Sequence, residues 1–310
     1  MLHQRWMLFL LTGFQFGCGS VGKGGVSGGG VDCDGRGGDV GCLLGWGEGC
    51  GGGAGATSWA PNGMVEVPAG EFVMGCGDGV LAAGLDRAVW EVCAPEHVVY
   101  LERFWIDKFE VTAGEFADCI GAGACSGQGE CITYGGVANI AYEVRSEYPM
   151  NCVSWSGAAE YCAWVGRRLC REAEWEKAAR GADGWLFPWG SEPLPDCCLT
   201  VMGAQGEATE GGDCECGLFD SQPIGSRLAD SSVYGTRDMC GNVSEWVADW
   251  YDWAYWKTAV PANPSGPSSG VERVRRGGNF TFYNPYMPLC LRLHNDPAWV
   301  NSEVGFRCCL

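Results

Sequence analysis

Histidine and basic residues are both scarce in this 310-residue sequence. It contains three histidines, and one of them, His3, lies in the first few residues. Zinc hydrolases and Ser-His-Asp triads both need imidazole, so this scarcity argues against both classes of enzyme. The 20 Lys and Arg residues stand against 38 Asp and Glu, a net charge of −18 that repels nucleic acid and anionic membrane surfaces. The same charge favours calcium, which takes carboxylate and carbonyl oxygens as ligands.

The apolar run over residues 6–16 is too short to span a bilayer, and two basic residues precede it. This pattern is typical of a signal peptide, which we place at residues 1–18. Phe16-Gly17-Cys18 is similar to a bacterial lipoprotein cleavage site with Cys18 as the lipidated residue, although Gln15 replaces the usual aliphatic residue. Ordinary cleavage near Ser20 is the alternative. The mature chain is therefore predicted to be extracytoplasmic, either secreted or an outer-envelope lipoprotein that meets the membrane only through its lipid.

Cysteine is abundant, with 20 residues, which in an exported chain predicts disulfides. Residues 19–61 are rich in glycine and cannot repay the entropy of folding, so they are predicted to be a flexible tether. Three cysteines fall in this segment, at positions 33, 42 and 50, and their odd number leaves one unpaired among themselves. Apart from these and Cys18, sixteen cysteines lie between Cys76 and Cys309, and we expect nearly all to be oxidised. Soft-metal binding is the alternative for Cys197-Cys198, Cys214-Glu215-Cys216 and Cys308-Cys309.

Alternating apolar residues predict strands early in the remaining chain. Met64-Val65-Glu66-Val67 followed by Phe72-Val73-Met74-Gly75 alternates like a β-hairpin. Residues 97–111 are predicted to contain further strand. Beyond Gly181 the chain is rich in Gly, Pro and Asn, with short strand-like runs.

Three segments carry helix signals. Thr112-Ala113-Gly114-Glu115 is a capping box that predicts a helix to about Ile120. Ser156 is predicted to cap a second helix to about Val165, with Ala159, Cys162 and Ala163 on one face. Residues 172–180 form the third, ended by Gly181. Together with the strands, these helices predict an α+β fold with much irregular structure, stapled by disulfides.

Several separated motifs occur in an order that resembles one known family. They are Met64-Val65-Glu66-Val67-Pro68-Ala69-Gly70-Glu71-Phe72-Val73-Met74-Gly75, Phe104-Trp105-Ile106-Asp107-Lys108-Phe109-Glu110-Val111-Thr112, Tyr148-Pro149-Met150-Asn151-Cys152-Val153-Ser154-Trp155, Gly166-Arg167-Arg168-Leu169, Glu172-Ala173-Glu174-Trp175-Glu176, Pro188-Trp189-Gly190, Asp238-Met239-Cys240-Gly241-Asn242-Val243-Ser244-Glu245-Trp246, Arg276-Gly277-Gly278 and Gly305-Phe306-Arg307-Cys308. Each motif alone is weak, but the ordered set over residues 62–310 resembles the formylglycine-generating enzyme, or sulfatase-modifying factor, family.

This resemblance implies a variant of the C-type-lectin-like fold for the domain at residues 62–310. Enzymes of the family bind copper through two cysteines and use oxygen to oxidise a cysteine of an unfolded sulfatase to formylglycine. Related members have lost that chemistry, so membership alone does not fix the activity.

The positions that match the two reactive cysteines hold Phe282 and Met287. Copper(I) needs soft thiolates, and a methionine can neither deprotonate nor form a mixed disulfide. The family's serine after Arg-Gly-Gly is Asn279 here, and a site tryptophan is Ser244. Cys290 lies nearby as a possible displaced thiol, but one cysteine cannot supply two thiolates. We therefore expect no copper at the family site and no catalytic residue.

The resemblance also implies a calcium loop. Its ligands would be the side chains of Asp238 and Glu245 and the carbonyls of Gly241 and Val243. The alternative is that the two carboxylates only cap and hydrogen-bond the loop.

The family further implies a Cys162–Cys308 disulfide. Its second disulfide is missing because Ala179 replaces one partner, while Cys170 and Cys240 are candidates for new disulfides, including one with Cys290. Arg171 replaces the usual threonine cap of the third helix, a loss of about 1 kcal/mol that a disulfide at Cys170 could offset.

The predicted function is a non-catalytic, calcium-stabilised binding or structural module at the cell surface. It is expected to be a monomer with an unknown protein or peptide ligand in the groove around residues 279–290. The alternative is an active copper-dependent oxidase that uses Cys290.

Overall fold

The protein is described here from a computed structural model that carries side chains. The structure describes residues 61–77, 87–126, 131–133, 136–141, 143–203, 219–283 and 287–310. Residues 57–310 form one compact unit. The predicted signal peptide, the Cys18 lipidation site and the tether with its three cysteines lie outside the described residues.

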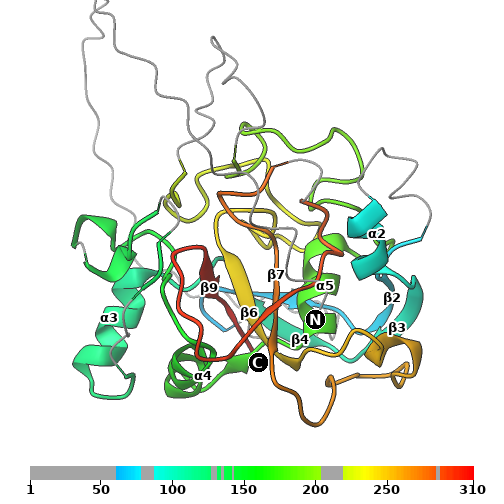
Figure 1. The fold of residues 1–310 in the computed structure, drawn as a ribbon, viewed down its shortest axis with the longest axis horizontal. Helices are drawn as coiled ribbons and strands as arrows, with labels where there is room; N and C mark the ends of the chain where they lie inside the picture. Colours follow the sequence, from blue (N-terminus) through cyan, green and yellow to red (C-terminus); the bar gives the residue numbers. More distant parts are fainter. Residues whose placement is uncertain are drawn as a thin grey trace, which may run out of the picture. The chain divides into compact units, whose positions relative to one another are not determined.

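Three sheets carry most of the regular structure. One has the strand order β1 (Met64–Val67), β4 (Phe104–Asp107), β10 (Cys308–Cys309) and β5 (Arg168–Leu169). The second pairs β2 (Gly70–Met74) with β3 (His97–Leu101), and the third has the order β8 (Leu293–Asn295), β7 (Arg273–Arg276), β6 (Ser244–Trp250) and β9 (Val304–Phe306). In Figure 1 the strands β6 and β7 run through the middle of the domain, with α3 and α4 on one side and β2 and β3 on the other.

The predicted hairpin between β1 and β2 is wrong, although both strands exist. Met64 pairs with Asp107 of β4, whereas Met74 pairs with His97 of β3. The two strands therefore belong to different sheets, and each finds a partner later in the chain. Alternation of apolar residues identifies a half-buried strand but does not identify the strand that pairs with it.

The helices follow the local sequence signals closely. Helix α3 (Ala113–Gly121) begins at the predicted capping box, in which Thr112 Oγ1 accepts from Glu115 N at 3.2 Å. Helix α4 (Trp155–Trp164) is capped by Ser154 rather than Ser156, because Ser154 Oγ accepts from Gly157 N at 3.1 Å. Its buried face is shifted accordingly and contains Gly157, Ala158, Tyr161 and Cys162. Short helices also occur: α2 (Arg87–Cys93), η1 (Asn139–Ala141), η2 (Glu143–Arg145) and η3 (Tyr255–Lys257).

Helix α5 (Glu172–Arg180) is fully buried and ends at Gly181 as predicted. Arg171 makes no side-chain cap, but its N–H donates to Glu174 Oε2 at 2.8 Å. Asp249 of β6 supplies the missing cap, since its Oδ2 accepts from Glu172 N at 2.7 Å. A residue 77 positions away in sequence thus replaces the local cap whose absence was expected to weaken this helix.

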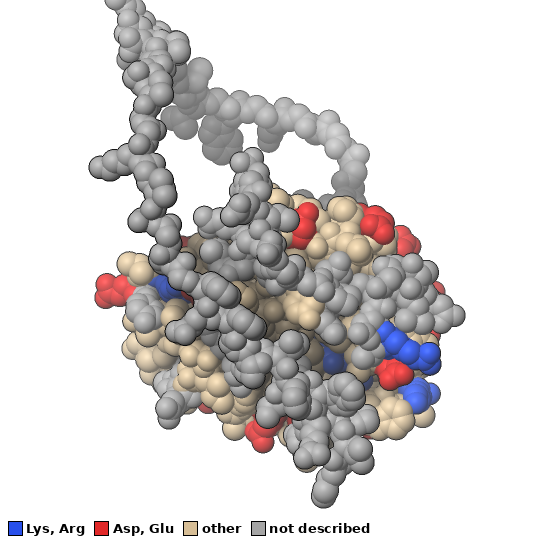
Figure 2. All heavy atoms as spheres, turned by 45° about the horizontal axis from the view of Figure 1, so that its top comes forward, with Lys and Arg blue, Asp and Glu red and all other residues tan. Residues whose placement is uncertain are grey.

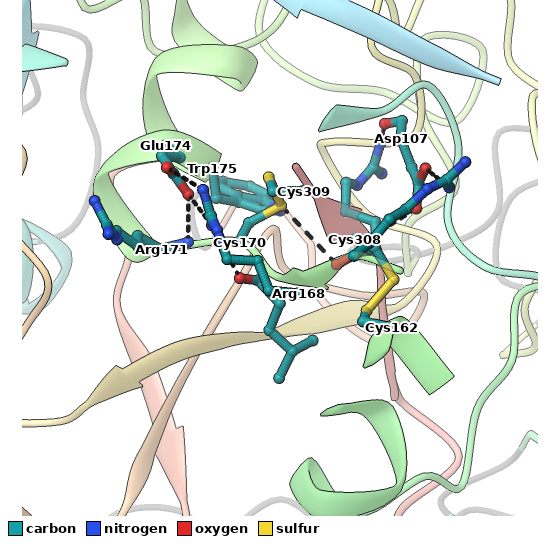
Figure 3. Close-up of a disulfide and its surroundings, with 12 residues drawn as sticks. Asp107, Cys162, Arg168, Cys170, Arg171, Glu174, Trp175, Cys308 and Cys309 are labelled. Atoms are coloured by element: carbon teal, nitrogen blue, oxygen red, sulfur yellow. Dashed lines mark hydrogen bonds and ion pairs between the residues drawn. A yellow bond between two sulfur atoms is a disulfide. The ribbon is translucent and has the colours of Figure 1, made fainter. Parts of the chain in front are cut away.

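Four disulfides join pairs of cysteines that both lie in the described residues and whose geometry is defined. The one implied by the family resemblance, Cys162–Cys308, is present and has an S–S distance of 1.98 Å. Beside it lies Cys170–Cys309, so the vicinal pair on β10 is tied to α4 and to the turn before α5 (Figure 3). The other two are Cys119–Cys125 and Cys131–Cys152.

No helix in the described ranges is long and apolar enough to cross a membrane. On the face in Figure 2, the acidic side chains that are visible are spread along the edge of the molecule, with basic side chains in a few small groups.

Candidate functional site

The two positions that match the reactive cysteines of the family lie against the hydrophobic core. Met287 is 1% exposed, and Phe282 is half-buried and packs against the same group of apolar side chains. A Cβ built on Gly278 would lie 3.3 Å from Met287 Sδ and 3.7 Å from Phe282 Cδ2, so both side chains converge on the Arg-Gly-Gly turn. Apolar side chains therefore fill the space beside this turn.

Two further departures from the family sequence contact each other. Asn279 is fully buried, and its Nδ2 lies 3.3 Å from Ser244 Oγ. Ser244 Oγ donates to Gly278 O at 2.7 Å, while Asn279 Oδ1 accepts from Thr281 N and Thr281 Oγ1. The small serine leaves room for the asparagine, and the pair fixes the backbone of the turn by hydrogen bonds. Sequence reasoning noted both substitutions but had no signal that they meet.

The predicted ligand groove is partly filled by buried side chains, while Thr281, Phe282 and Tyr283 are partly exposed. Asn279, Phe280, Met287 and Cys290 are all at most 1% exposed. Residues 284–286, in the middle of the predicted groove, lie outside the described residues.

The cysteines differ from the expectation of nearly complete oxidation. Cys170 pairs with Cys309, so neither Cys170 nor Cys240 forms a disulfide with Cys290. Among the cysteines in the described ranges, four are buried and carry free thiols: Cys76, Cys93, Cys240 and Cys290. Cys197 and Cys198, by contrast, are disulfide-bonded. Cys290 is 197 positions from Cys93, so no spacing in the sequence indicated that these thiols lie close to each other.

The predicted calcium loop begins at Asp238, which has a left-handed backbone with φ of 54°. Its Oδ2 accepts from Gly225 N at 2.5 Å, and burial raises the pKa of this carboxyl to about 6. Gly241 also has a positive φ, and a Cβ there would lie 2.2 Å from Val201 O. Glycine is required at this position by the close approach of another backbone segment.

The other predicted carboxylate ligand, Glu245, already has a positive partner. Arg307 donates to both of its carboxylate oxygens at 2.7 Å, and Trp175 Nε1 donates to Oε2 at 2.8 Å. Glu245 and Arg307 are both at most 1% exposed. Burial lowers the pKa of Arg307, but the charge and hydrogen bonds of Glu245, together with the charges of Glu110 and Asp238, raise it above its usual value. A carboxylate offers about four acceptor positions, and these bonds use three of them. The arrangement fits a buried ion pair better than a calcium ligand.

A small polar pocket of about 200 Å³ opens next to this loop. Its lining includes Asp107, Glu110, Glu115, Tyr161 and Arg167. Asp107 forms an ion pair with Arg167, and burial raises its pKa to about 6. Glu110 accepts from the loop and is fully buried, which raises its pKa well above the usual value. The pocket is thus walled by side chains that hold the domain together.

The strand order, the sparse helices and the disulfides define an α+β, disulfide-rich variant of the C-type-lectin-like fold. The chain belongs to the formylglycine-generating enzyme family, because the model of the sulfatase-modifying factor enzyme 1-like domain matches residues 54–310. It is 30% identical over 297 residues to the formylglycine-generating enzyme of Streptomyces coelicolor, covering 83% of this chain and 91% of that enzyme.

The chain is also similar to two other proteins. The chain is 34% identical over 170 residues to the inactive C-alpha-formylglycine-generating enzyme 2 of Mus musculus, covering 53% of this chain and 49% of that protein. The structure of PvdO from Pseudomonas aeruginosa superimposes with a TM-score of 0.63 at 24% identity, covering 79% of this chain and 93% of PvdO.

Proposed function

We propose that this domain does not oxidise sulfatase cysteines and serves instead as an exported binding or structural module. The observation that carries the proposal is the pair Phe282 and Met287 at the positions of the reactive cysteines. Neither side chain can form the thiolate that copper(I) requires, and Met287 is buried in the core. The chemistry of the family therefore lacks its first requirement at this place.

The remaining features support a stable scaffold. Two disulfides join the last strand to α4 and to the turn before α5, and buried ion pairs such as Arg307–Glu245 lie between elements far apart in sequence. Both active and inactive proteins occur among the curated relatives, so inactivity would not be unusual within the family. The signal peptide predicted from residues 1–18 supports export, where these disulfides persist. Calcium is not part of the proposal, because Arg307 already neutralises Glu245.

The test is an oxidation assay with the full chain, copper, oxygen and a cysteine-containing sulfatase peptide. Mass spectrometry of the peptide reports conversion of the thiol to the aldehyde. We expect no conversion, while the formylglycine-generating enzyme of Streptomyces coelicolor, assayed in parallel, should convert the peptide. Conversion by this chain would refute the proposal.

The alternative function, an oxidase that uses Cys290, has its own control. If conversion occurs, Cys290→Ser should abolish it, while Cys240→Ser should not, because Cys240 is a second buried free thiol. Conversion that survives both substitutions would exclude the alternative as well.

A further inference from the structure

Three buried thiols converge from three separate segments of the domain. Cys76 follows β2, Cys93 ends α2, and Cys290 lies just before β8. Their sulfur atoms all lie within 4.8 Å of one another, and none of the three residues is more than 4% exposed. Cys290 Sγ and Cys93 Sγ are 2.6 Å apart. None of the three stands at a position that matches the family's copper cysteines, which are Phe282 and Met287 here.

The backbone that carries these thiols is held by specific hydrogen bonds. Cys76 N donates to Cys93 O at 3.2 Å, which fixes two of the three segments against each other. Gly75 permits this approach, because a Cβ there would lie 2.8 Å from Cys93 O. Arg180 Nη1 donates to Gly75 O at 2.6 Å, and Arg276 Nη1 donates to Cys290 O at 3.2 Å. The three sulfur atoms are thus brought together by an organised framework rather than by flexible loops.

Two buried guanidinium groups lie next to the thiols. Arg180 contacts Gly75 O and Arg276 contacts Cys290 O, and both are also paired with the buried carboxylates of Glu172 and Glu176. A neighbouring positive charge lowers the cost of an anionic sulfur group in a buried position.

We propose that Cys76, Cys93 and Cys290 form a buried three-thiolate site for a thiophilic metal ion, with Cu(I) preferred over Zn(II). Thiolates select soft ions, and the described residues supply three sulfur ligands and no fourth His, Cys, Asp or Glu within the same distance. Zinc sites in proteins almost always have four ligands, whereas monovalent copper is satisfied by fewer. Metal–sulfur bonds of about 2.3 Å place three sulfurs about 4 Å apart, so the sulfurs of Cys93 and Cys290, now 2.6 Å apart, must separate by roughly 1.4 Å on binding.

Such a site would stabilise the domain rather than oxidise a substrate. All three ligands are buried, so a sulfatase peptide has no access to the ion. The ion would cross-link β2, α2 and the segment before β8, where the described residues contain no disulfide. This role is independent of the proposed loss of activity, because the peptide assay and the metal measurements can fail separately.

The competing structure is a Cys93–Cys290 disulfide with Cys76 left as a thiol. The full chain is first denatured without reductant and alkylated, and its peptides are analysed by mass spectrometry. We expect Cys76, Cys93 and Cys290 all to be alkylated. A Cys93–Cys290 disulfide in the purified protein would overturn the proposal.

The same protein is then loaded with Cu(I) or Zn(II) without oxygen and dialysed against a competing chelator. We expect about one copper ion per chain to remain, with X-ray absorption reporting three sulfur neighbours. Cys76→Ser should lose the ion, whereas Cys240→Ser, which removes a buried thiol outside the group, should retain it. Retention of zinc instead of copper, lost in Cys76→Ser, would support the site but overturn the choice of ion.

Misfolding of Cys76→Ser is monitored by the Cys162–Cys308 peptide and by circular dichroism, and Cys290→Ser provides a second variant. The number of sulfur neighbours that X-ray absorption reports for the ion in the wild-type protein does not depend on either variant. Copper retained equally by both thiol variants, or a wild-type ion with two sulfur neighbours, would overturn the proposal.

Discussion

The two disulfides on β10 should stabilise the domain in a strongly coupled way. Cys162–Cys308 and Cys170–Cys309 join residues 146 and 139 positions apart, and each alone would close a very long loop in the unfolded chain. With one of them formed, however, the other closes only a short loop. Eight positions separate Cys162 from Cys170, and Cys308 adjoins Cys309.

The chain-entropy relation turns this geometry into magnitudes. A loop of about 140 residues corresponds to roughly 5 kcal/mol, and one of about ten residues to roughly 2.7 kcal/mol. Replacing either pair by alanine should therefore lower the free energy of unfolding by only about 2.7 kcal/mol, because the other disulfide remains. Replacing both pairs should lower it by about 7.7 kcal/mol, which exceeds the sum of the two single effects by roughly 2 kcal/mol.

Urea unfolding without reductant, at a pH of about 6 where thiol exchange is slow, measures the free energy of unfolding. It is applied to the wild type, the two variants that lack one disulfide and the variant that lacks both. The matched control is the Cys131–Cys152 disulfide, whose loop of 21 positions does not overlap the other two. Removing it together with Cys162–Cys308 should give additive losses. The reasoning is refuted if each β10 pair alone costs about 5 kcal/mol and the two losses simply add.

Two further predictions concern buried carboxylates. Burial and the charge of Glu172 raise the pKa of Asp249 to about 7, so the folded protein binds this proton more tightly than the unfolded chain does. The contribution of this proton to the free energy of unfolding is greatest below the unfolded pKa of about 3.9 and is lost as pH rises through 7. Asp249→Asn keeps an oxygen that accepts from Glu172 N but cannot titrate. Between pH 5 and 7.5 the free energy of unfolding should therefore fall less in this variant than in the wild type, by on the order of 2 kcal/mol. An unchanged pH dependence in urea unfolding would contradict this prediction. Calcium should not raise the melting temperature, because Arg307 already neutralises Glu245, and calorimetry with calcium and with a chelator checks this. A saturable rise that disappears in Glu245→Gln would restore the calcium prediction.

Elements fixed by contacts between close neighbours were predictable. The capping box at Thr112 and the glycine at position 181 set the ends of α3 and α5, because a helix terminus is satisfied by residues within one turn. The ordered motifs identified the family and with it the fold. The cap of α4 was misplaced by two residues, since Ser154 and Ser156 are equally good local candidates and only the bond to Gly157 distinguishes them.

The candidate sites depended on contacts that no local pattern contains. Phe282 and Met287 could be read from the sequence as an absence of thiols, but their burial against the core could not. The contact of Ser244 with Asn279 and the ion pair of Glu245 with Arg307 join residues 35 and 62 positions apart. The same holds for Cys93 and Cys290, which are 197 positions apart.

The sequence by itself determined the family, the three main helices, the presence of strands β1 and β2, and the lack of thiols at positions 282 and 287. Only the tertiary structure decided the strand partners, the cap that Asp249 gives to α5, and which cysteines remain reduced. Hydrogen bonds within a turn of helix depend on a few adjacent residues, whereas strand pairing, ion pairing and the meeting of thiols depend on how distant segments pack around a common core.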